Sequence, residues 1–330
     1  MAERVFIIAE AGVNHNGSLD IAMELVDAAA AAGADAVKFQ TFTADTLVSK
    51  SAQKAEYQKA STGVDETQYE MLKRLELSDT AHRAIMARCV ERGVLFLSTA
   101  FDPNGIRYLD SLGVPLIKIS SGEITDLPYL RAAAECRKPI ILSTGMSTMD
   151  EIAAAIDILD GVPLTLLHCT TEYPCPFDAV NLRAMLSMRE RFGLPVGYSD
   201  HTPGVEVAVA AVAMGAAVIE KHFTLDRSMP GPDHKASLEP GELVRMVAAI
   251  RNVEKSLGDG VKRLADAERK NVAVARKSIV AKCLIRKGEP FTEDNITAMR
   301  PGTGVSPMRW DEFVGMSAGR DYSEGELLQG

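Results

Sequence analysis

The sequence lacks any apolar run of the roughly 20 residues that a membrane-spanning helix needs. Its first residues, MAERVFIIAEAG, show no basic segment followed by a long apolar stretch, so no secretory signal peptide is expected. The five cysteines are odd in number and none belongs to a CxxC pair, which predicts reduced thiols in a reducing compartment. Together these absences predict a cytoplasmic protein that does not act at a membrane.

The sequence also contains fewer basic than acidic residues. Lys and Arg number 36 against 45 Asp and Glu, which gives a formal net charge of −9. This balance argues against nucleic acid as a partner, because phosphate backbones are bound by basic surfaces. It does not argue against an anionic substrate, since a few local basic residues can outweigh the overall field. Hydrophobic residues make up 46%, as in an ordinary globular enzyme.

Eight apolar runs recur along the first two thirds of the chain, and most are continuous, as parallel strands buried on both faces should be. They lie at 5–12, 35–41, 93–101, 115–122, 139–145, 164–170, 194–200 and 216–223. Between them lie Ala- and Leu-rich amphipathic segments, among them 19–33, 149–161 and 204–215. Eight β/α units in about 220 residues predict an α/β protein with a closed (β/α)₈ TIM barrel. A doubly wound open sheet is the alternative.

The sequence also predicts three parts. Residues 1–258 form the barrel, whose last helix is expected at 240–258. Residues 259–274 are polar and are expected to be a linker. Residues 275–330 have short β-like runs and turn residues but no long helical period, which predicts a small β-rich module.

A long insertion interrupts the regular spacing between Thr41 and Gly93, and it includes the polar stretch 49–70. Long loops after barrel strands usually help to form a site or a lid, because they lie at the face where active sites occur. The alternative is an exposed decoration without a role in the site.

Two histidines follow consecutive apolar runs, His201 in GYSDH and His222 in VIEKH. If these runs are neighbouring parallel strands, both imidazoles point into one mouth of the barrel and can share a divalent metal ion. Asp200 and Lys221 stand at the same strand ends. The alternative for each histidine is a purely structural hydrogen bond.

Two lysines interrupt apolar strands, Lys38 in AVKFQ and Lys118 in LIKIS. A buried lysine is costly unless an anion meets it, so both are expected to bind a phosphate or carboxylate, together with Ser121, Ser143 and Ser199. Two alternatives remain open. The lysines could pair with Glu10 or Glu123, or one could form a Schiff base with a carbonyl substrate.

Several segments resemble the sialic-acid synthase family in order and spacing, over essentially the whole chain. They are IAEAGVNHNG (8–17), AVKFQTF (36–42), FLSTAFD (96–102), KISSGE (118–123), LSTGMS (142–147), LHCTTEYPCPF (167–177), GYSDHT (197–202) and IEKHFTLDRSMPGPDHKASLEP (219–240). The tail with MRPGTGVSP (299–307) resembles that family's antifreeze-like, or SAF, domain.

The resemblance implies a transferase that condenses phosphoenolpyruvate with an N-acetylated mannosamine-type sugar, either 2,4-diacetamido-2,4,6-trideoxymannose or N-acetylmannosamine. The product is a nine-carbon nonulosonic acid, and inorganic phosphate is released. The resemblance also implies a divalent metal, Mn²⁺ or Mg²⁺, and a homodimer in which the SAF domain of one subunit caps the active site of the other.

The resemblance further assigns roles to individual residues. His201 and His222 match the metal ligands, and Glu123, Lys118 and Glu10 match catalytic positions. The phosphoenolpyruvate contacts correspond to Lys38, Thr99, Lys118, Ser121, Ser143 and Ser199. The sugar contacts correspond to Glu10, Gln40, Tyr173, Asp233 and Arg300, the last contributed by the swapped domain.

One position departs from part of the family, because Thr171 stands where some members have Asn. Together with GPDHKASLEP, this makes the chain more similar to legionaminic-acid synthases.

Three alternative functions remain open: another metal-dependent synthase that joins phosphoenolpyruvate to a sugar, a Schiff-base aldolase and a non-catalytic sugar-binding protein.

Overall fold

The computed structural model describes residues 4–54 and 66–329. It divides into two compact units, Met1–Asp259 and Gly260–Gly330, which are described separately below. The predicted borders at 258, 274 and 275 remain predictions. Helix α12 (Asp266–Ala275) begins within the stretch 259–274 that the sequence marks as a linker and ends one residue beyond it.

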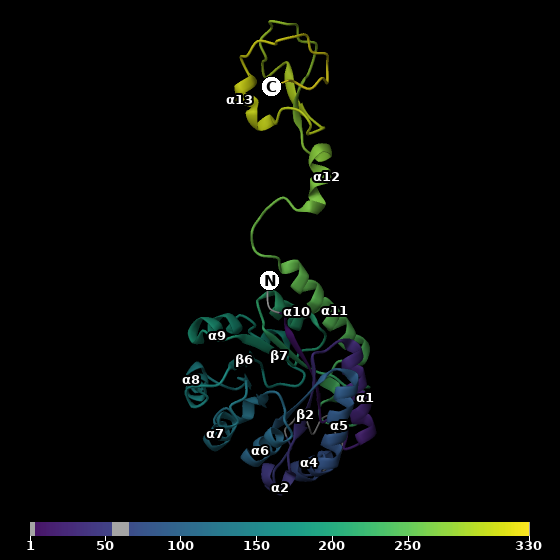
Figure 1. Ribbon diagram of the computed structural model, residues 1–330, viewed down its shortest axis with the longest axis vertical. Helices are drawn as coiled ribbons and strands as arrows, with labels where there is room; N and C mark the ends of the chain where they lie inside the picture. The colour runs from purple at the N-terminus through teal and green to yellow at the C-terminus, as the bar shows by residue number, and fades with distance from the viewer. Residues whose placement is uncertain (1–3, 55–65, 330) are drawn as a thin grey trace. The chain divides into compact units, whose positions relative to one another are not determined.

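The first unit is a closed barrel of parallel strands, as the sequence predicts, and each apolar run contains one strand. The strands follow each other around the barrel in chain order, and β1 pairs with β8 to close it. Figure 1 shows the helices arranged around these strands. Their bounds are β1 Phe6–Gly12, β2 Ala36–Thr41, β3 Leu95–Ala100, β4 Ile117–Ile119, β5 Ile140–Ser143, β6 Leu164–His168, β7 Val196–Asp200 and β8 Val218–His222. The open-sheet alternative is therefore wrong.

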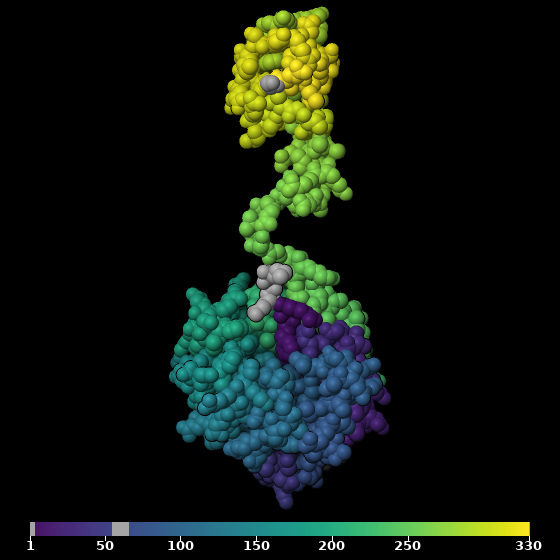
Figure 2. Space-filling view, viewed as in Figure 1, coloured from purple at the N-terminus to yellow at the C-terminus, as the bar shows by residue number. Residues whose placement is uncertain are grey.

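Helices surround this barrel. They are α1 Leu19–Ala32, α2 Ala44–Leu47, α4 Gln68–Leu75, α5 Asp79–Arg92, α6 Pro103–Ser111, α7 Leu127–Glu135, α8 Met149–Ile158, α9 Ala184–Phe192, α10 Glu206–Ala213 and α11 Pro240–Leu257. Helix α8 begins with a capping box in which Thr148 and Glu151 satisfy each other's backbone N–H groups. The purple first part and the green last part of the unit lie side by side in Figure 2. A hydrogen bond joins these two parts, because Arg251 of α11 donates to the Val5 carbonyl.

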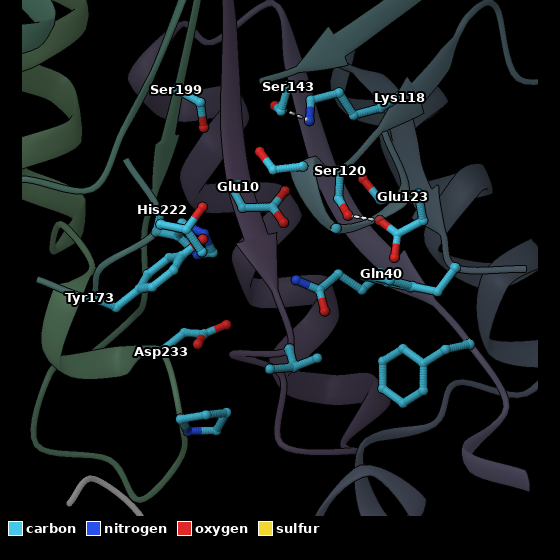
Figure 3. Close-up of a pocket in the computed structure, with 18 of the residues that line it drawn as sticks. Glu10, Gln40, Lys118, Ser120, Glu123, Ser143, Tyr173, Ser199, His222 and Asp233 are labelled. Atoms are coloured by element: carbon cyan, nitrogen blue, oxygen red, sulfur yellow. Dashed lines mark hydrogen bonds between the residues drawn. The ribbon is translucent and has the colours of Figure 1, made fainter. Parts of the chain in front are cut away.

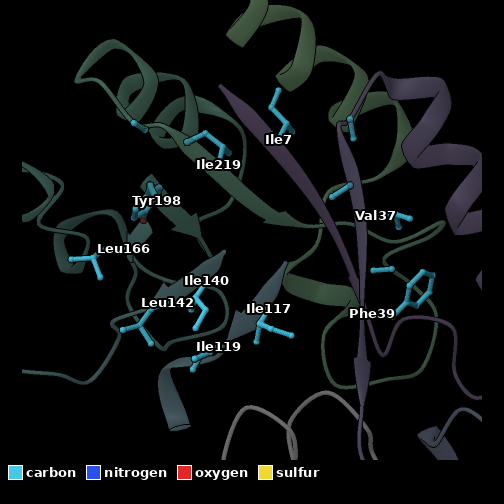
Figure 4. Packing of buried hydrophobic residues seen from close by; sticks show 14 of the residues in the cluster. Ile7, Val37, Phe39, Ile117, Ile119, Ile140, Leu142, Leu166, Tyr198 and Ile219 are labelled. Atoms are coloured by element: carbon cyan, nitrogen blue, oxygen red, sulfur yellow. The ribbon is translucent and has the colours of Figure 1, made fainter. Parts of the chain in front are cut away.

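Strand residues alternate between two apolar layers. Side chains such as Ile7, Val37 and Ile219 face outward and pack against the helices (Figure 4). Their inward-facing neighbours from six strands contact one another and fill the barrel: Ile8, Ala36, Leu97, Ile141, Leu167 and Val218. Because side chains alternate with a period of two, the residues two positions further along each strand also point inward, one layer nearer the C-terminal mouth.

Glycine is required at one point in this interior. A Cβ atom on Gly197 of β7 would lie 2.3 Å from the Val218 carbonyl oxygen and 2.7 Å from Leu167 Cδ2. Any side chain there would push β7 away from β8, the two strands that lead to His201 and His222.

The insertion after β2 contains α2 and α4, and residues 55–65 of its polar stretch lie outside the described residues. Met71 and Leu75 of α4 form a small apolar cluster with Val13 and Phe42, onto which Leu47, Leu72 and Phe101 pack. Helices α2 and α4, the described helices of the insertion, are thus held against the barrel by hydrophobic contacts rather than projecting as an exposed decoration.

The second unit has a separate core, which includes Ile279, Phe291, Phe313 and Tyr322. Two short strands, β9 Ser278–Ala281 and β10 Ile296–Met299, pair antiparallel, and isolated bridges and the short helix α13 (Trp310–Phe313) complete it. The predicted small β-rich module is confirmed. Among the described helices of both units, none has the length and apolar character to cross a membrane.

Candidate active site

A cavity of about 460 Å³ lies at the C-terminal ends of the barrel strands. Every predicted site residue except Arg300 lines it: Glu10, Lys38, Gln40, Thr99, Lys118, Ser121, Glu123, Ser143, Tyr173, Ser199, His201, His222 and Asp233. Figure 3 shows their arrangement, with His222, Tyr173 and Asp233 on one side of the hollow and Lys118, Ser120 and Glu123 on the other. The structure thus brings together residues from positions 10 to 233 of the chain.

Lys38 is buried, and it meets anions within the protein. Its Nζ atom lies 2.8 Å from Glu10 Oε2 and 3.7 Å from Glu220 Oε2, and it donates a hydrogen bond of 2.9 Å to Thr99 Oγ1. Burial opposes the charged form, but these two carboxylates raise the pKa of Lys38, so it is a cation. The pairing of Lys38 with Glu10 that the sequence left open is therefore present.

Lys118 lies nearby and pairs with neither Glu10 nor Glu123. It donates hydrogen bonds to Ser143 Oγ at 2.8 Å and to the Ile119 carbonyl at 3.1 Å, and its Nζ lies 3.5 Å from Glu220 Oε1. Burial lowers the pKa of Lys118. A second anion near this ammonium group would stabilise its charged form.

Glu220 joins the two lysines, and the sequence analysis missed it. Its carboxylate approaches both ammonium groups and accepts a hydrogen bond of 3.1 Å from Ser199 Oγ. Although burial alone would raise it, Lys118 and Lys38 hold the pKa of Glu220 low. The period-two alternation of β8 could have revealed it, because Glu220 shares the inward face with Val218 and His222.

Lys221 and Asp200 point away from the cavity, so their grouping with the site's strand ends is wrong. Lys221 Nζ lies 2.8 Å from Asp200 Oδ2, and both side chains are fully buried. Asp200 Oδ1 also accepts hydrogen bonds from the backbone N–H and the hydroxyl of Thr202. This outward-facing ion pair fixes the backbone on either side of His201 and next to His222.

His201 and His222 face each other with 5.6 Å between their ring centroids. His201 Nδ1 lies 2.7 Å from the Thr170 carbonyl, which places its proton on Nδ1 and leaves Nε2 as a lone-pair donor. His222 Nδ1 is buried without a hydrogen-bond partner. Burial lowers the pKa of both imidazoles, so both are neutral, the form that binds metal ions.

Three carboxyl groups of the cavity resist ionisation. Burial raises the pKa of Glu123 to about 7 and that of Asp233 to about 6. Burial also raises the pKa of Glu10 to about 7, although Lys38 opposes this shift. The Ser120 hydroxyl donates a hydrogen bond to Glu123 Oε2. Groups that change protonation near neutral pH inside a cavity are candidates for proton transfer.

Ser121 lies in a tight corner with Cys169, a lining residue that the sequence analysis did not single out. Ser121 Oγ lies 3.2 Å from Cys169 Sγ and accepts a hydrogen bond of 2.9 Å from the Gly145 N–H. A Cβ atom at Gly145 would lie 2.4 Å from Thr171 Oγ1 and 2.9 Å from both Cys169 Sγ and Ser121 Oγ, so only glycine fits among these three side chains.

Arg300 belongs to the second unit, where it is exposed and its Nε donates a hydrogen bond to the Ala275 carbonyl. Its assignment to a sugar site remains a prediction, as do the individual roles of the residues that line the cavity.

Comparison with known protein families divides the chain into the same two parts as the structure, a barrel and a small C-terminal unit. A family model described as the NeuB family matches residues 25–262, and the SAF domain model matches residues 276–330. The chain belongs to the NeuB family. The resemblance to sialic-acid synthases, and the barrel followed by an SAF domain, are thereby confirmed.

Relatives of this NeuB-family chain match it over nearly its whole length. An N,N'-diacetyllegionaminic acid synthase of Campylobacter jejuni is 51% identical over 332 residues, covering 99% of each chain. A protein of the same name from Legionella pneumophila is 49% identical over 330 residues, covering 98% of this chain and 93% of the relative. The crystal structure of an N-acetylneuraminic acid synthetase from Leptospira borgpetersenii superposes with a TM-score of 0.72 at 34% identity, covering 82% of this chain and 90% of that one.

Proposed function

We propose that this protein condenses phosphoenolpyruvate with 2,4-diacetamido-2,4,6-trideoxymannose to give N,N'-diacetyllegionaminic acid and inorganic phosphate. The observation that carries the proposal is the cavity that combines two buried lysines, a pair of neutral imidazoles and carboxyl groups that titrate near neutrality. The two relatives with this product in their names, 51% and 49% identical over nearly the full chain, support the choice of sugar.

The imidazole pair fits a divalent cation, Mn²⁺ or Mg²⁺. His201 Nε2 and the unpartnered His222 are neutral lone-pair donors at a separation that suits a shared ion. Within residues 4–54 and 66–329, no group of three or more His, Cys, Asp or Glu side chains could hold a metal, so the other ligands would be water or substrate oxygens. When bound, the cation would act as a Lewis acid that polarises the aldehyde of the open-chain sugar.

The two lysines hold the anionic groups of phosphoenolpyruvate. An incoming phosphate or carboxylate competes with Glu10 and Glu220 for Lys38 and Lys118, and the hydroxyls of Ser143 and Thr99 already bind these ammonium groups. The raised pKa of Glu10 eases this exchange, because a protonated Glu10 no longer competes for Lys38. The same ammonium groups stabilise the charge that develops on the departing phosphate.

The reaction joins the methylene carbon of phosphoenolpyruvate to the aldehyde carbon of the sugar. Positive charge then develops on the carbon that carries the phosphate ester, and water adds there. Glu123 as a carboxylate accepts one proton of this water and passes it to the sugar oxygen, which becomes a hydroxyl group. Phosphate then leaves by cleavage of its C–O bond and takes the proton of the added hydroxyl, which produces the keto group. Fixing both reactants in one cavity supplies much of the acceleration.

We further propose a homodimer in which the SAF domain of one subunit covers the cavity of the other and contributes Arg300. Arg300 is exposed in the second unit, where its Nε donates a hydrogen bond to the Ala275 carbonyl, and the other guanidinium nitrogens would donate to the ligand. Such a cover would exclude water that could otherwise waste phosphoenolpyruvate.

An aldolase that uses Lys118 is the second candidate, because burial lowers the pKa of this lysine as a Schiff-base nucleophile requires. Its contact with Glu220 at 3.5 Å opposes this, since a carboxylate favours the ammonium form. Incubation with pyruvate and borohydride separates the candidates, because an aldolase gains the mass of a reduced pyruvate adduct and a synthase does not.

The decisive experiment measures phosphate release from phosphoenolpyruvate with each candidate sugar in the presence of Mn²⁺. We expect release that depends on 2,4-diacetamido-2,4,6-trideoxymannose, with a product of the mass of N,N'-diacetyllegionaminic acid. Absence of release with that sugar, in protein that binds Mn²⁺, would reject the proposed function.

A further inference from the structure

The cavity is lined by two chemically different surfaces. One surface, here called the charged floor, carries the lysines, carboxylates and imidazoles described above. The opposite wall is apolar and consists of Val13, Phe42, Leu47, Val48, Met71, Leu72, Leu75 and Phe101, here called the apolar wall. A reaction between phosphoenolpyruvate and an aldehyde needs the charged floor, but it gives no reason for a hydrophobic surface facing it.

The apolar wall lies nearer the mouth than the charged floor, as the register of β2 and β3 requires. Gln40 and Thr99 are paired neighbours that face inward, and Phe42 and Phe101 each follow them by two residues. Two residues of extended chain advance about 7 Å, so the two phenyl rings stand one layer above Gln40 and Thr99. Their centroids are 6.0 Å apart in an edge-to-face arrangement.

Helix α4 supplies the rest of the apolar wall from the insertion. Met71 and Leu75 are buried in the cluster with Phe42, whereas Leu72 is only partly buried and lines the cavity. Leu47 of α2 and Phe101 are likewise partly exposed and line the cavity. Leu72, Leu47 and Phe101, together with the partly exposed Val48, are therefore the side chains of the apolar wall that can contact a ligand.

We infer that the apolar wall selects sugars that end in a methyl group at C6 and rejects those that carry a 6-hydroxyl. This inference rests on the proposed function. The aldehyde end of the sugar must reach the imidazoles on the floor, so the C6 end extends toward the mouth, where Leu72, Leu47 and Phe101 stand. The apolar wall is thus a specificity determinant of the synthase.

The selection has a simple physical origin. A methyl group that packs against leucine and phenylalanine leaves water without giving up any hydrogen bond, so its burial is favourable. A hydroxymethyl group in the same place gives up a hydrogen bond to water, and the apolar wall offers no replacement. Hydrophobic pockets discriminate against an added hydroxyl by about 100-fold in kcat/KM. We expect a preference of that order for a 6-deoxy sugar.

Two sugars that differ only at C6 isolate this effect, 2-acetamido-2,6-dideoxymannose and N-acetylmannosamine. Phosphate release with saturating phosphoenolpyruvate gives kcat/KM for each, and we expect the 6-deoxy sugar to be preferred about 100-fold. Equal use of the two sugars would overturn the inference while leaving the proposed function intact. If neither they nor 2,4-diacetamido-2,4,6-trideoxymannose supports release, the proposed function fails and the inference falls with it.

The variant Leu72→Gln tests the apolar wall itself, because it places an amide at the cavity and retains good helix propensity. The preference for the 6-deoxy sugar should fall at least about tenfold, since the amide can bind the 6-hydroxyl. The ratio of two kcat/KM values is independent of the fraction of folded enzyme. If Leu72→Gln yields no folded protein, Leu47→Gln on α2 provides the same test.

Leu186→Gln is the matched control, because Leu186 is exposed on α9 and does not line the cavity. Its preference should equal that of the unaltered protein. An unchanged preference in Leu72→Gln, or an equal fall in Leu186→Gln, would overturn the inference.

Discussion

The imidazole rings of His201 and His222 lie with their centroids 5.6 Å apart, at the ends of neighbouring strands β7 and β8. Tyr173 stacks against His201 with 4.1 Å between centroids and meets His222 edge-on at 5.7 Å. The aromatic contacts and the bond to the Thr170 carbonyl hold the two rings in place, so the pair exists before any ion is bound.

The first prediction concerns metal binding. His222→Asn should weaken Mn²⁺ binding more than about 100-fold, because altering residues that merely orient a ligand already costs 10–100-fold. Titration calorimetry or the paramagnetic resonance signal of free Mn²⁺ measures this without turnover. His168→Asn is the control, since His168 Nε2 lies 2.7 Å from the Val180 carbonyl and the ring does not line the cavity. Full activity in excess chelator would contradict a metal role.

The second prediction concerns pH. Burial raises the pKa of Glu123 to about 7, and a base acts only when ionised, so kcat should rise with pH through about 7 and then level off. Glu123→Gln should lower kcat by about 100- to 10,000-fold and remove this rise. A pH–rate profile of each protein measures both effects.

A partner of Glu123 offers a sharper version of that test. The Ser120 hydroxyl donates a hydrogen bond to Glu123, which favours the carboxylate. Ser120→Ala should therefore shift the rise in kcat to higher pH while keeping its shape. A shift to lower pH would mean that Glu123 is not the group that titrates.

The sequence alone could predict parallel strands, because strands covered on both faces are continuous apolar runs, and the count of eight such runs favoured a closed barrel over an open sheet. The sequence could also predict that Lys38 and Lys118 are buried at the site, since each interrupts one of these apolar runs. It did not reveal which strand-end residues face the cavity. Lys221 is as polar as Glu220, and only the alternation of β8 places Glu220 inside and Lys221 in an outward ion pair.

The apolar wall escaped prediction for a different reason. Phe42, Leu72 and Phe101 are residue types found in any hydrophobic core. They are far apart in the sequence, so the sequence does not indicate that they contact one another. Only the packing of α4 against the barrel turns them into one side of a cavity. The role proposed for Arg300 requires the barrel of a second subunit, so the contacts within one chain do not test it.

The third prediction concerns the ion pair behind the histidines. Lys221→Met leaves Asp200 buried without its partner and should lower the free energy of unfolding by about 3–5 kcal/mol. The double variant Asp200→Asn with Lys221→Met should recover part of this loss, because no buried charge remains. Far-ultraviolet circular dichroism in a denaturant series measures it. The only tryptophan, Trp310, lies in the second unit and cannot report directly on the barrel.

The fourth prediction tests the exchange of SAF domains. Arg300→Ala should raise the KM for the sugar more than about tenfold and leave the KM for phosphoenolpyruvate unchanged, because a buried charged contact to a ligand is worth at least that much. Arg309→Ala is the control, since Arg309 is an exposed arginine of the same unit that pairs with Glu312. A change in the KM for phosphoenolpyruvate alone would contradict the role of Arg300.

Combining two defective chains decides whether Arg300 acts across subunits, when activity is measured at a sugar concentration far below the KM of the Arg300→Ala protein. Co-expressed His222→Ala and Arg300→Ala chains should then recover about a quarter of the normal activity, because about half of random dimers are mixed and each mixed dimer has one intact site of two. If Arg300 instead serves the barrel of its own chain, every site carries one defect and the activity stays at or below that of the Arg300→Ala protein. Each variant expressed alone should show no more than that residual activity, which ties any recovery to the barrel of one chain and the SAF domain of the other.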